Sequence, residues 1–373
     1  MNVLLIYSVM IPSVRLCAFE ILNHLFKHKK INLKCVRKND LTYECFKNVN
    51  IVIFVRADSM IERYISKKLK ARGLHCIYVL DDDLLNVPTN ISSYIHYGIK
   101  SVKKNIIKIM KNCDTIVSPS DKLIEKYGKI FKHRIKIDEP TLVINEIRSN
   151  SNVLKIGFAG SIDRKNDFSE EISRAVSKIY MRYKDKVQFE FFGAKPDIVE
   201  KFNFKWIPYE ECYEKYIQKI KNLSWDIGLA PMPSSEFHKC KYQNKYIEYG
   251  SFGIIGIYSN VIPYSNNIIN EQTGFLVENT EKAWFDILDK IISKKVNLIK
   301  IKTNIYNNLK NRYSIEIVSR NFFKEIEKNL KSYQNFDKFE NNIFTTKDNI
   351  VFKIYLLFEK IILFIKRKFI LDY

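Results

Sequence analysis

The chain has 373 residues, of which 46% are hydrophobic and 28% are charged. A chain of this length is too long for a domain with one ordinary hydrophobic core and suits two domains. The composition excludes disorder as the general state of the chain. Lysine and arginine number 62 against 41 aspartates and glutamates, which gives a net charge of +21. That excess favours anionic partners such as nucleic acid, a membrane surface or phosphorylated ligands, without choosing among them.

Cysteine spacing argues against metal and disulfide chemistry. The seven cysteines form no C-x-x-C pair and no regular pattern with the six histidines, so neither a zinc site nor a disulfide framework is predicted. The opening residues MNVLLIYSVM lack a basic region and a small-residue cleavage site. We interpret them as a first β-strand and not as a signal peptide, and we expect a reducing, cytoplasmic location.

Apolar, β-rich runs alternate with helical segments in the first part of the chain. The runs lie at 3–9, 32–36, 51–57, 75–82 and 115–120. Segments 59–72 and 92–111 between them have helical periodicity. This alternation is typical of a doubly wound parallel sheet. It breaks over 133–153, where RSNSN at 148–152 has the composition of a linker, so we place the first domain at 1–145.

The alternation restarts in the second part of the chain. The apolar runs there lie at 154–160, 187–193, 205–209, 225–232, 254–259 and 274–279. We therefore predict a second domain at 146–313 and a fold of two tandem Rossmann-like α/β units. Ligands in such sheets bind outside the carboxyl ends of the strands, so two facing units would enclose a cleft with a site on each wall.

The first turn of the second domain carries a candidate phosphate cradle. Gly160 ends the run 154–160 and Ser161 follows it; both offer backbone N–H groups, and Arg164 and Lys165 come closely behind. The segment is neither a G-x-G-x-x-G fingerprint nor a Walker motif. An ordinary turn with a solvated basic pair is the competing interpretation.

The segment 240–253, CKYQNKYIEYGSFG, concentrates charge on one predicted helix. At helical spacing Lys241, Lys245 and Glu248 share a face, and both lysines lie at the end where the helix dipole is already positive. A diphosphate at this end would explain the lysines, and Glu248 could accept hydrogen bonds from a ribose. The alternative is an exposed ion pair between Glu248 and either lysine.

Residues 245–284 resemble the second domain of the retaining group 1 glycosyltransferases (family 4-like), which have the GT-B fold. A Glu-Tyr pair on a helix, a small residue, a strand, a loop and a Thr-Gly segment follow in the family's order and spacing. The matching positions are Glu248, Tyr249, Gly250, Gly253, 254–259 and 273–277. The segment 77–88, IYVLDDDLLNVP, is also similar to part of the first domain of some surface-polysaccharide members.

This resemblance implies a role for each charged position. Glu248 would bind the ribose of the nucleotide, while the backbone around Phe237 and His238 would approach the transferred sugar. The cations that would neutralise the donor diphosphate are Lys241, Lys245, Arg164 and Lys165. Cys240 replaces the first glutamate of a pair that many members have, and the nearest upstream acid is Glu236.

Transfer from a nucleotide sugar needs negative charge to be stabilised on the leaving phosphate and the acceptor hydroxyl to be placed. Lys245, with other fixed cations and a helix N-terminus, would meet the first need, so neither a metal nor a cofactor is expected. We expect Asp82 and Asp83, at the end of a first-domain strand, to recognise acceptor hydroxyls or to deprotonate the attacking one. A helix N-cap or an ion pair with Arg56 is the alternative, and Arg56 and Arg15 are weaker candidates for an acceptor phosphate.

Two helical segments close the chain. The segment 314–334 resembles the helix that returns to the first domain in GT-B proteins. In the tail, 335–373, the amphipathic segment 349–371 has uncharged runs far shorter than the ~20 residues of a membrane span. The basic residues that recur there every seven positions are Lys353, Lys360 and Arg367. This pattern favours an in-plane helix on an anionic membrane, with packing on the first domain or a second subunit as the alternative.

Together these features predict a cytoplasmic, peripherally membrane-associated GT-B glycosyltransferase. The resemblance implies transfer, with retention, from a nucleoside-diphosphate sugar to a glycan or lipid-linked acceptor in surface-polysaccharide or glycoconjugate synthesis. A GT-B nucleotide-sugar epimerase is one alternative. A basic scaffold or nucleic-acid-binding protein is another, supported only by the charge of +21. No helix-turn-helix or aromatic RNA-binding signature accompanies that charge, so no specific nucleic acid is expected.

Overall fold

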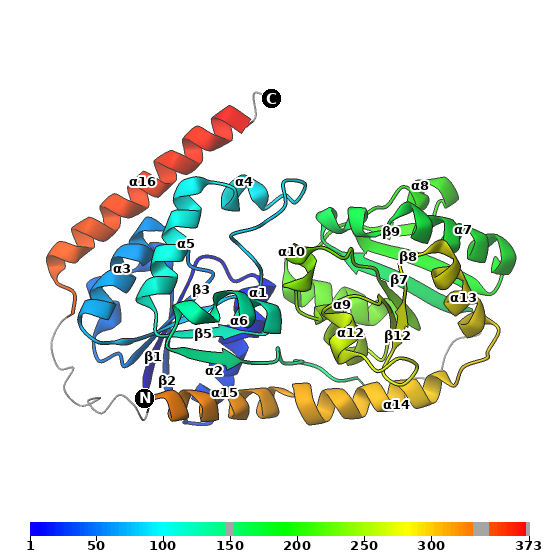
Figure 1. Ribbon diagram of the computed structural model, residues 1–373, viewed down its shortest axis with the longest axis horizontal. Coiled ribbons are helices and arrows are strands. Elements are labelled where there is room, and N and C mark those ends of the chain that lie inside the picture. The colour runs from blue at the N-terminus through cyan, green and yellow to red at the C-terminus, as the bar shows by residue number, and fades with distance from the viewer. Residues whose placement is uncertain (146–152, 331–342, 371–373) are drawn as a thin grey trace. The chain divides into compact units, whose positions relative to one another are not determined.

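The structure is a computed structural model that describes residues 1–145, 153–330 and 343–370, with the side chains of the last helix described up to Ile361. The chain forms two compact α/β units (Figure 1). Unit 1 comprises Met1–Thr89, Ser93–Glu139 and Ile315–Tyr373. Unit 2 comprises Asn90–Ser92 and Pro140–Ser314.

Unit 1 is built on a parallel sheet of six described strands in the order β2-β1-β3-β4-β5-β6. They are β1 (Asn2–Tyr7), β2 (Asn32–Arg37), β3 (Ile51–Val55), β4 (His75–Val79), β5 (Thr115–Ser118) and β6 (His133–Lys136). The strands β3 and β4 are buried along their whole length, as expected for apolar runs in a sheet covered on both faces. The order reverses between β1 and β3, so a ligand crevice is expected at their carboxyl ends.

Helices surround this sheet. They are α1 (Pro12–Val14), the π-helical turn η1 (Arg15–Phe19), α2 (Glu20–Lys27), η2 (Lys38–Asp40), η3 (Tyr43–Phe46), α3 (Met60–Ala71), α4 (Tyr94–Tyr97), α5 (Lys100–Asn112), α6 (Asp121–Tyr127), η4 (Gly128–Ile130), α15 (Ile315–Leu330) and α16 (Thr346–Ile370). A capping box fixes the start of α3. The Ser59 hydroxyl accepts from the Glu62 N–H at 3.2 Å, and the Glu62 carboxylate accepts from the Ser59 N–H at 3.1 Å.

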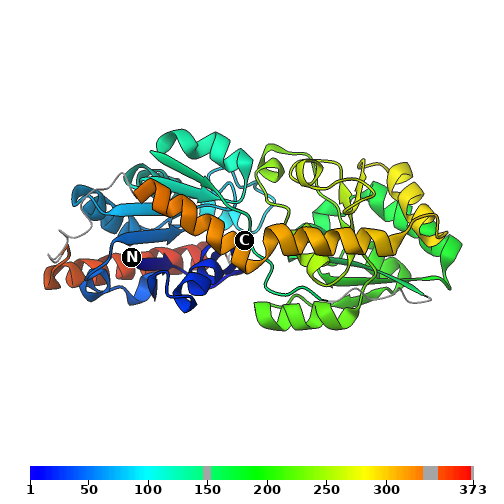
Figure 2. The same cartoon turned by 90° about the horizontal axis from the view of Figure 1, so that it is seen from below.

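The two last helices belong to unit 1. The helix α15, orange in Figure 2, packs against α2 and places Val318, Phe322 and Ile326 in the core of unit 1. The helix α16 packs against α3 and η3. Among the described helices, none is long and apolar enough to cross a membrane.

Unit 2 repeats the architecture with its own parallel sheet of six described strands, in the order β12-β11-β10-β7-β8-β9. They are β7 (Leu154–Gly160), β8 (Val187–Gly193), β9 (Lys205–Ile207), β10 (Ile227–Ala230), β11 (Ile255–Ser259) and β12 (Phe275–Val277). The helical elements are η5 (Ile162–Asp167), α7 (Glu170–Tyr183), α8 (Ile198–Phe202), α9 (Tyr213–Leu223), α10 (Glu236–Lys239), α11 (Asn244–Ser251), α12 (Tyr264–Asn267), α13 (Glu281–Ile292), α14 (Leu298–Asn308) and η6 (Leu309–Tyr313). Gly157 lets the ring of Trp225 lie on β7, since a Cβ there would fall 1.9 Å from that ring.

The predicted fold class is confirmed: each unit is a doubly wound parallel α/β sheet. The predicted break in the pattern over 133–153 is wrong at its start, where β6 forms the edge of the first sheet. Only Ile135 of its four residues is buried, so an edge strand leaves little apolar signal. The predicted linker at 148–152 and the side chain of Arg367 lie outside the described part of the chain.

Candidate functional site

The strand order of unit 2 reverses between β7 and β10, so its ligand crevice is expected at the carboxyl ends of these strands. Arg164, on η5 after β7, reaches across to the segment after β10, where its Nη2 donates to the Pro231 carbonyl at 3.0 Å. Its Nε lies 2.9 Å from Asp167 Oδ2 as an ion pair without hydrogen-bond geometry. His238 Nε2 lies 3.7 Å from Asp167 Oδ1. Asp167 thus brings two predicted residues together at this crevice.

A polar group formed by the buried Lys245 and the half-buried Glu248 and Tyr216 lies near Arg164. The Lys245 Nζ is 2.5 Å from Glu248 Oε1, and the Tyr216 hydroxyl donates to the same oxygen at 2.6 Å. Lys245 also donates to the Tyr216 hydroxyl at 3.2 Å. Burial lowers the pKa of the Lys245 ammonium, Glu248 opposes that change, and the charge of Arg164 adds to it. A bound anion would stabilise the charged form of such a buried lysine, which lies beside another cation.

Glu248 is engaged through one oxygen. Both bonds from within the described residues end on Oε1, so Oε2 can accept hydrogen bonds from a ligand such as a ribose. The same ion pair also fits the alternative of a purely structural Lys245–Glu248 contact. Tyr216, on α9, was not predicted to belong to the site. A single tyrosine in a helical pattern does not indicate which other helix its side chain will contact. Burial and the Glu248 charge raise its pKa well above the usual range, so Tyr216 stays a hydroxyl donor.

The prediction of a single helix starting at residue 240 is wrong. The segment forms the short helix α10, then a turn, and α11 begins only at Asn244. Lys245 is therefore in the first turn of α11, as predicted, but Lys241 precedes the helix and does not share its face with Glu248. The Lys241 ammonium lies 4.7 Å from the centre of the Phe237 ring. The break arises because Ser235 caps a separate helical turn, its hydroxyl accepting from the His238 N–H at 3.3 Å.

Phe237 and His238 occupy different environments on α10. The Phe237 side chain is only 6% exposed, so it supports the turn from the core side. His238 is held by two polar neighbours, Ser235 Oγ at 2.7 Å from its Nδ1 and Asp167 at its Nε2. This arrangement orients the imidazole next to the Arg164 ion pair.

Gly160 and Ser161 form the tight turn that was predicted as a phosphate cradle. A Cβ on Gly160 would lie 2.8 Å from the Cβ of Arg164, so only glycine lets the η5 turn fold back this closely. Gly193 at the end of β8 has a φ of +80° and approaches the Gly160 carbonyl, where a Cβ would lie 2.1 Å from that oxygen. Ser161 is exposed, and its carbonyl accepts from the Arg164 N–H at 2.9 Å.

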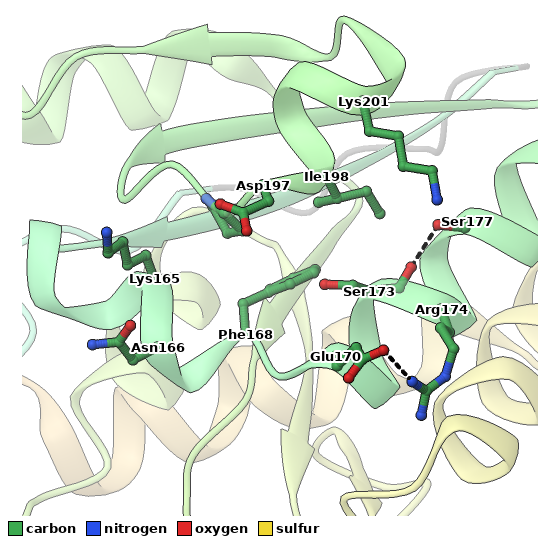
Figure 3. Close-up of a pocket in the computed structure, with 11 residues that line it drawn as sticks. Lys165, Asn166, Phe168, Glu170, Ser173, Arg174, Ser177, Asp197, Ile198 and Lys201 are labelled. Carbon is green, nitrogen blue, oxygen red and sulfur yellow. Dashed lines mark hydrogen bonds and ion pairs between the residues drawn. The ribbon is translucent and has the colours of Figure 1, made fainter.

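Lys165 is not brought to Arg164 or Lys245. It lines a cavity of about 520 Å³ between η5, α7 and α8 (Figure 3). Lys165 and Lys201 lie on opposite sides of that cavity in the close-up, and Arg174 pairs with Glu170 at 2.7 Å. The sequence pair of basic residues is therefore split by the η5 turn, and only Arg164 turns toward β10.

In unit 1 the aspartate triplet follows β4, next to Arg56, which follows β3. Arg56 Nη1 donates to both carboxylate oxygens of Asp81 at 3.1 Å and to the Ser13 hydroxyl at 3.2 Å. Asp82 is further away, 3.9 Å from Arg56, with a quarter of its side chain exposed. Arg56 itself has a φ of +52°, which is an unfavourable backbone conformation for a residue other than glycine. Such residues are often found at functional positions.

The expected pairing of Asp82 with Asp83 needs correction. Asp83 is fully buried, and its carboxylate accepts from Lys126 Nζ at 2.6 Å, from the Tyr127 hydroxyl and from the Asn86 amide at 3.1 Å. Such a saturated carboxylate is a structural group and is not available to an acceptor hydroxyl. Asp81 and Asp82 therefore lie on the side of Arg56, whereas Asp83 faces α6, where it contacts Lys126 and Tyr127.

Glu139 is a member of this crevice that we did not predict, since DEP at 138–140 has the composition of a linker. It is 3% exposed, and Cys17 Sγ donates to its Oε1 at 3.2 Å. Burial, followed by the charge of Asp81, raises the pKa of Glu139 to about 8. Glu139 therefore carries a proton at neutral pH and adds no charge beneath Asp81.

Two further predictions concern charge in these crevices. Arg15 is 2.6 Å from Glu20, so the position that we proposed for an acceptor phosphate already holds a carboxylate. Arg56 is likewise committed to Asp81. Among the described residues no group of three or more His, Cys, Asp and Glu side chains is arranged to hold a metal ion, and metal independence stays a prediction.

No protein-family model and no curated protein sequence matches the chain. Solved structures do match. HepE (Alr3699) of Anabaena, solved with UDP, aligns with a TM-score of 0.60 and 11% identity over 89% of this chain and 100% of that chain. The fold is GT-B.

Other GT-B structures agree. A glycosyltransferase from Rickettsia africae aligns with a TM-score of 0.58 and 16% identity over 90% of this chain and 99% of that one. An α-glucosyltransferase solved with UDP and DNA containing an HMU base aligns with a TM-score of 0.57 and 11% identity over 88% and 99%. TarM aligns with a TM-score of 0.55 and 11% identity; the alignment covers 84% of this chain and 58% of TarM.

Proposed function

We propose that this GT-B protein transfers a sugar from a nucleoside-diphosphate sugar to an acceptor hydroxyl. The observation that carries the proposal is the partly buried Lys245–Glu248–Tyr216 group beside Arg164 at the strand-order reversal of unit 2. A ligand with both a diphosphate and a ribose satisfies these groups at once. The whole-length alignment with HepE, whose structure was solved with UDP, supports the same ligand class.

The residues divide the work of binding. Lys245 and Arg164, with Lys241 nearby, neutralise the diphosphate, and Glu248 Oε2 accepts from the ribose hydroxyls. The Gly160 turn lets the backbone approach the phosphates, and His238 contacts the sugar. Charge that develops on the leaving phosphate then meets cations already in place, which lowers the barrier without reorganisation.

The reaction itself exchanges one glycosidic bond for another. The bond between the anomeric carbon and the diphosphate oxygen breaks, and a bond from that carbon to the acceptor oxygen forms with retention of configuration. The acceptor proton passes to the departing nucleoside diphosphate. On the acceptor side, Asp82 accepts the hydroxyl hydrogen bond, because Asp81 is committed to Arg56. No metal takes part in this scheme.

The acceptor we propose is a glycan or its lipid carrier in surface-polysaccharide or glycoconjugate synthesis. Both arginines of the unit 1 crevice are paired with carboxylates, and Asp82 adds a further negative charge. This crevice therefore suits a neutral, hydroxyl-bearing group better than a phosphate. We place the enzyme in the cytoplasm, attached peripherally to the membrane, with no specific nucleic-acid partner.

Calorimetric titration of the full chain with UDP and with GDP tests the proposal. We expect one of the two to bind, and Glu248→Ala to weaken it by about 1–3 kcal/mol through loss of charge-assisted hydrogen bonds. Glu281→Ala is the matched control, since Glu281 is also a partly buried, ion-paired carboxylate of unit 2. Failure of both nucleotides to bind would refute the donor site, and equal losses in the two variants would return Glu248 to a structural role.

A further inference from the structure

The helix α16 is mounted on unit 1 by one of its faces. Phe352, 1% exposed, packs its ring 6.3 Å from that of Tyr64, on α3. Asp348 accepts from the Tyr64 hydroxyl at 2.7 Å, and Glu359 accepts from the Met60 N–H at 2.9 Å. Buried aromatic contact between two polar anchors eleven residues apart fixes the orientation of the helix on α3, with the rest of its surface turned outward.

The opposite face of α16 is apolar and exposed. We call it the outer face; it consists of Ile350 (62% exposed), Ile354 (46%), Leu357 (59%), Phe358 (53%) and Ile361 (44%). These positions repeat every three to four residues, so they form one continuous stripe along the helix. Lys353 and Lys360, both exposed, border the stripe. Such a concentration of large exposed apolar side chains on one helix face marks an interaction surface.

A row of lysines lies on the neighbouring helix α5. This helix has five lysines and no acidic residue. Those that are exposed on one side, the α5 lysine row, are Lys100, Lys104, Lys108 and Lys111. The helices α5 and α16 are neighbours in unit 1, since Lys104 and Glu359 line the same cavity of about 290 Å³. Apolar and cationic surfaces of unit 1 are therefore close together.

We propose that the outer face of α16 docks unit 1 in the plane of an anionic lipid bilayer, with the α5 lysine row facing the headgroups. An apolar stripe bordered by lysines inserts into the boundary between headgroups and acyl chains, and nearby lysines add attraction to acidic lipids. A second copy of the chain fits less well. Outer faces packed on each other would bring Lys353 and Lys360 of both copies together.

Docking through α16 assigns the membrane contact to unit 1. The helix α16 packs on α3, which follows β3 and begins close to Arg56 in the chain. The unit for which we propose the acceptor role is therefore the one that would contact the bilayer. This docking does not depend on the proposed sugar transfer. It adds that a lipid-linked acceptor would reach the enzyme from the side of unit 1.

Vesicle flotation of the full chain tests the proposal. We expect binding to vesicles of phosphatidylglycerol and phosphatidylcholine, weaker binding to phosphatidylcholine alone, and a fall of the first toward the level of the second at high salt. Replacing Leu357 and Phe358 together by Glu should weaken binding by about tenfold or more. Ile299→Glu, at an equally exposed apolar position of unit 2 (61%), should leave it unchanged. Lys104→Gln with Lys108→Gln should reduce only the anionic-lipid component.

Three results would overturn the docking. They are no flotation of the wild-type chain with either vesicle, equal flotation of the Leu357→Glu/Phe358→Glu variant and the Ile299→Glu control, or a dimer in sedimentation that this double variant converts to monomer without a change in flotation. UDP titration of the same preparations keeps the two proposals apart. Nucleotide binding without flotation removes only the membrane contact, and flotation without nucleotide binding removes only the donor site.

Discussion

Replacing Glu139 by Gln should change how the stability of unit 1 depends on pH. Glu139 is buried, and its pKa of about 8 stands against 4.5 for an ordinary glutamate. Between these values the folded state holds a proton that the unfolded state has lost. The folded state thus binds more protons, so this residue makes stability fall as pH rises through the window, with no cost below pH 4.5 and the full cost above pH 8.

The size of the effect follows from the separation of the two pKa values. At about 1.4 kcal/mol per pH unit, the burial of Glu139 costs up to about 5 kcal/mol once pH exceeds 8. Glutamine keeps the shape and never ionises. The stability difference between Glu139→Gln and wild type should therefore shift toward the variant by a few kcal/mol between pH 5 and pH 8, whatever constant cost the exchange of a carboxyl for an amide adds.

The assay must report on unit 1 alone. All three tryptophans lie in unit 2, so indole fluorescence would follow the other unit. Hydrogen exchange of buried amides in β1 and β3 measures the opening of unit 1 directly. Glu125→Gln, at an exposed carboxylate on α6, serves as the control. A difference between Glu139→Gln and wild type that stays constant with pH would show that Glu139 is ionised in the folded protein and refute the reasoning.

Three other outcomes are expected. UDP affinity should fall as pH rises, because the diphosphate needs Lys245 in its protonated form. Burial lowers the pKa of Lys245, so the fall should begin below the pKa of ~10.4 of an ordinary lysine. An affinity that stays constant with pH in calorimetry would exclude Lys245 from the diphosphate site. Asp83→Ala should destabilise unit 1 by about 1–3 kcal/mol, since the Tyr127 hydroxyl and the Asn86 amide lose a buried acceptor, with UDP affinity unchanged. Gly157→Ala should cost about 1–3 kcal/mol or more through the clash with Trp225, measurable as an earlier fluorescence-detected melt; an unaltered melt would mean that the ring can move.

Much of the residue cluster in the unit 2 crevice could be predicted from the sequence because its residues are close together in the chain. Lys245 and Glu248 are three residues apart on one helix, and local periodicity places them together. Arg164 follows a strand end, where ligand sites of such sheets are expected. Tyr216 could not be found this way, because it comes from α9, and only the packing of α9 against α11 brings its hydroxyl to Glu248.

In the unit 1 crevice we expected Asp82 and Asp83 to act together, whereas the structure places Asp81 and Asp82 beside Arg56. The triplet at 81–83 could be assigned to a strand end, but which two carboxylates face the crevice depends on the direction in which the chain leaves β4. Burial against Lys126 removes Asp83 from the crevice. Glu139 follows β6 and Cys17 follows β1, so their contact joins residues 122 positions apart that no local pattern connects.

Short-range periodicity in apolar burial was enough to predict the two α/β units, most of their strands and the charged residues at strand ends, although it missed the edge strand β6. Tertiary structure alone decided which of those charges meet, which carboxylates lose their charge, and which face of α16 remains outside. Lys245, Glu139 and Phe352 have their electrostatic and packing environments set by residues distant in the chain. Desolvation and pairing energies depend on those three-dimensional neighbours, so they cannot be read from spacing along the chain.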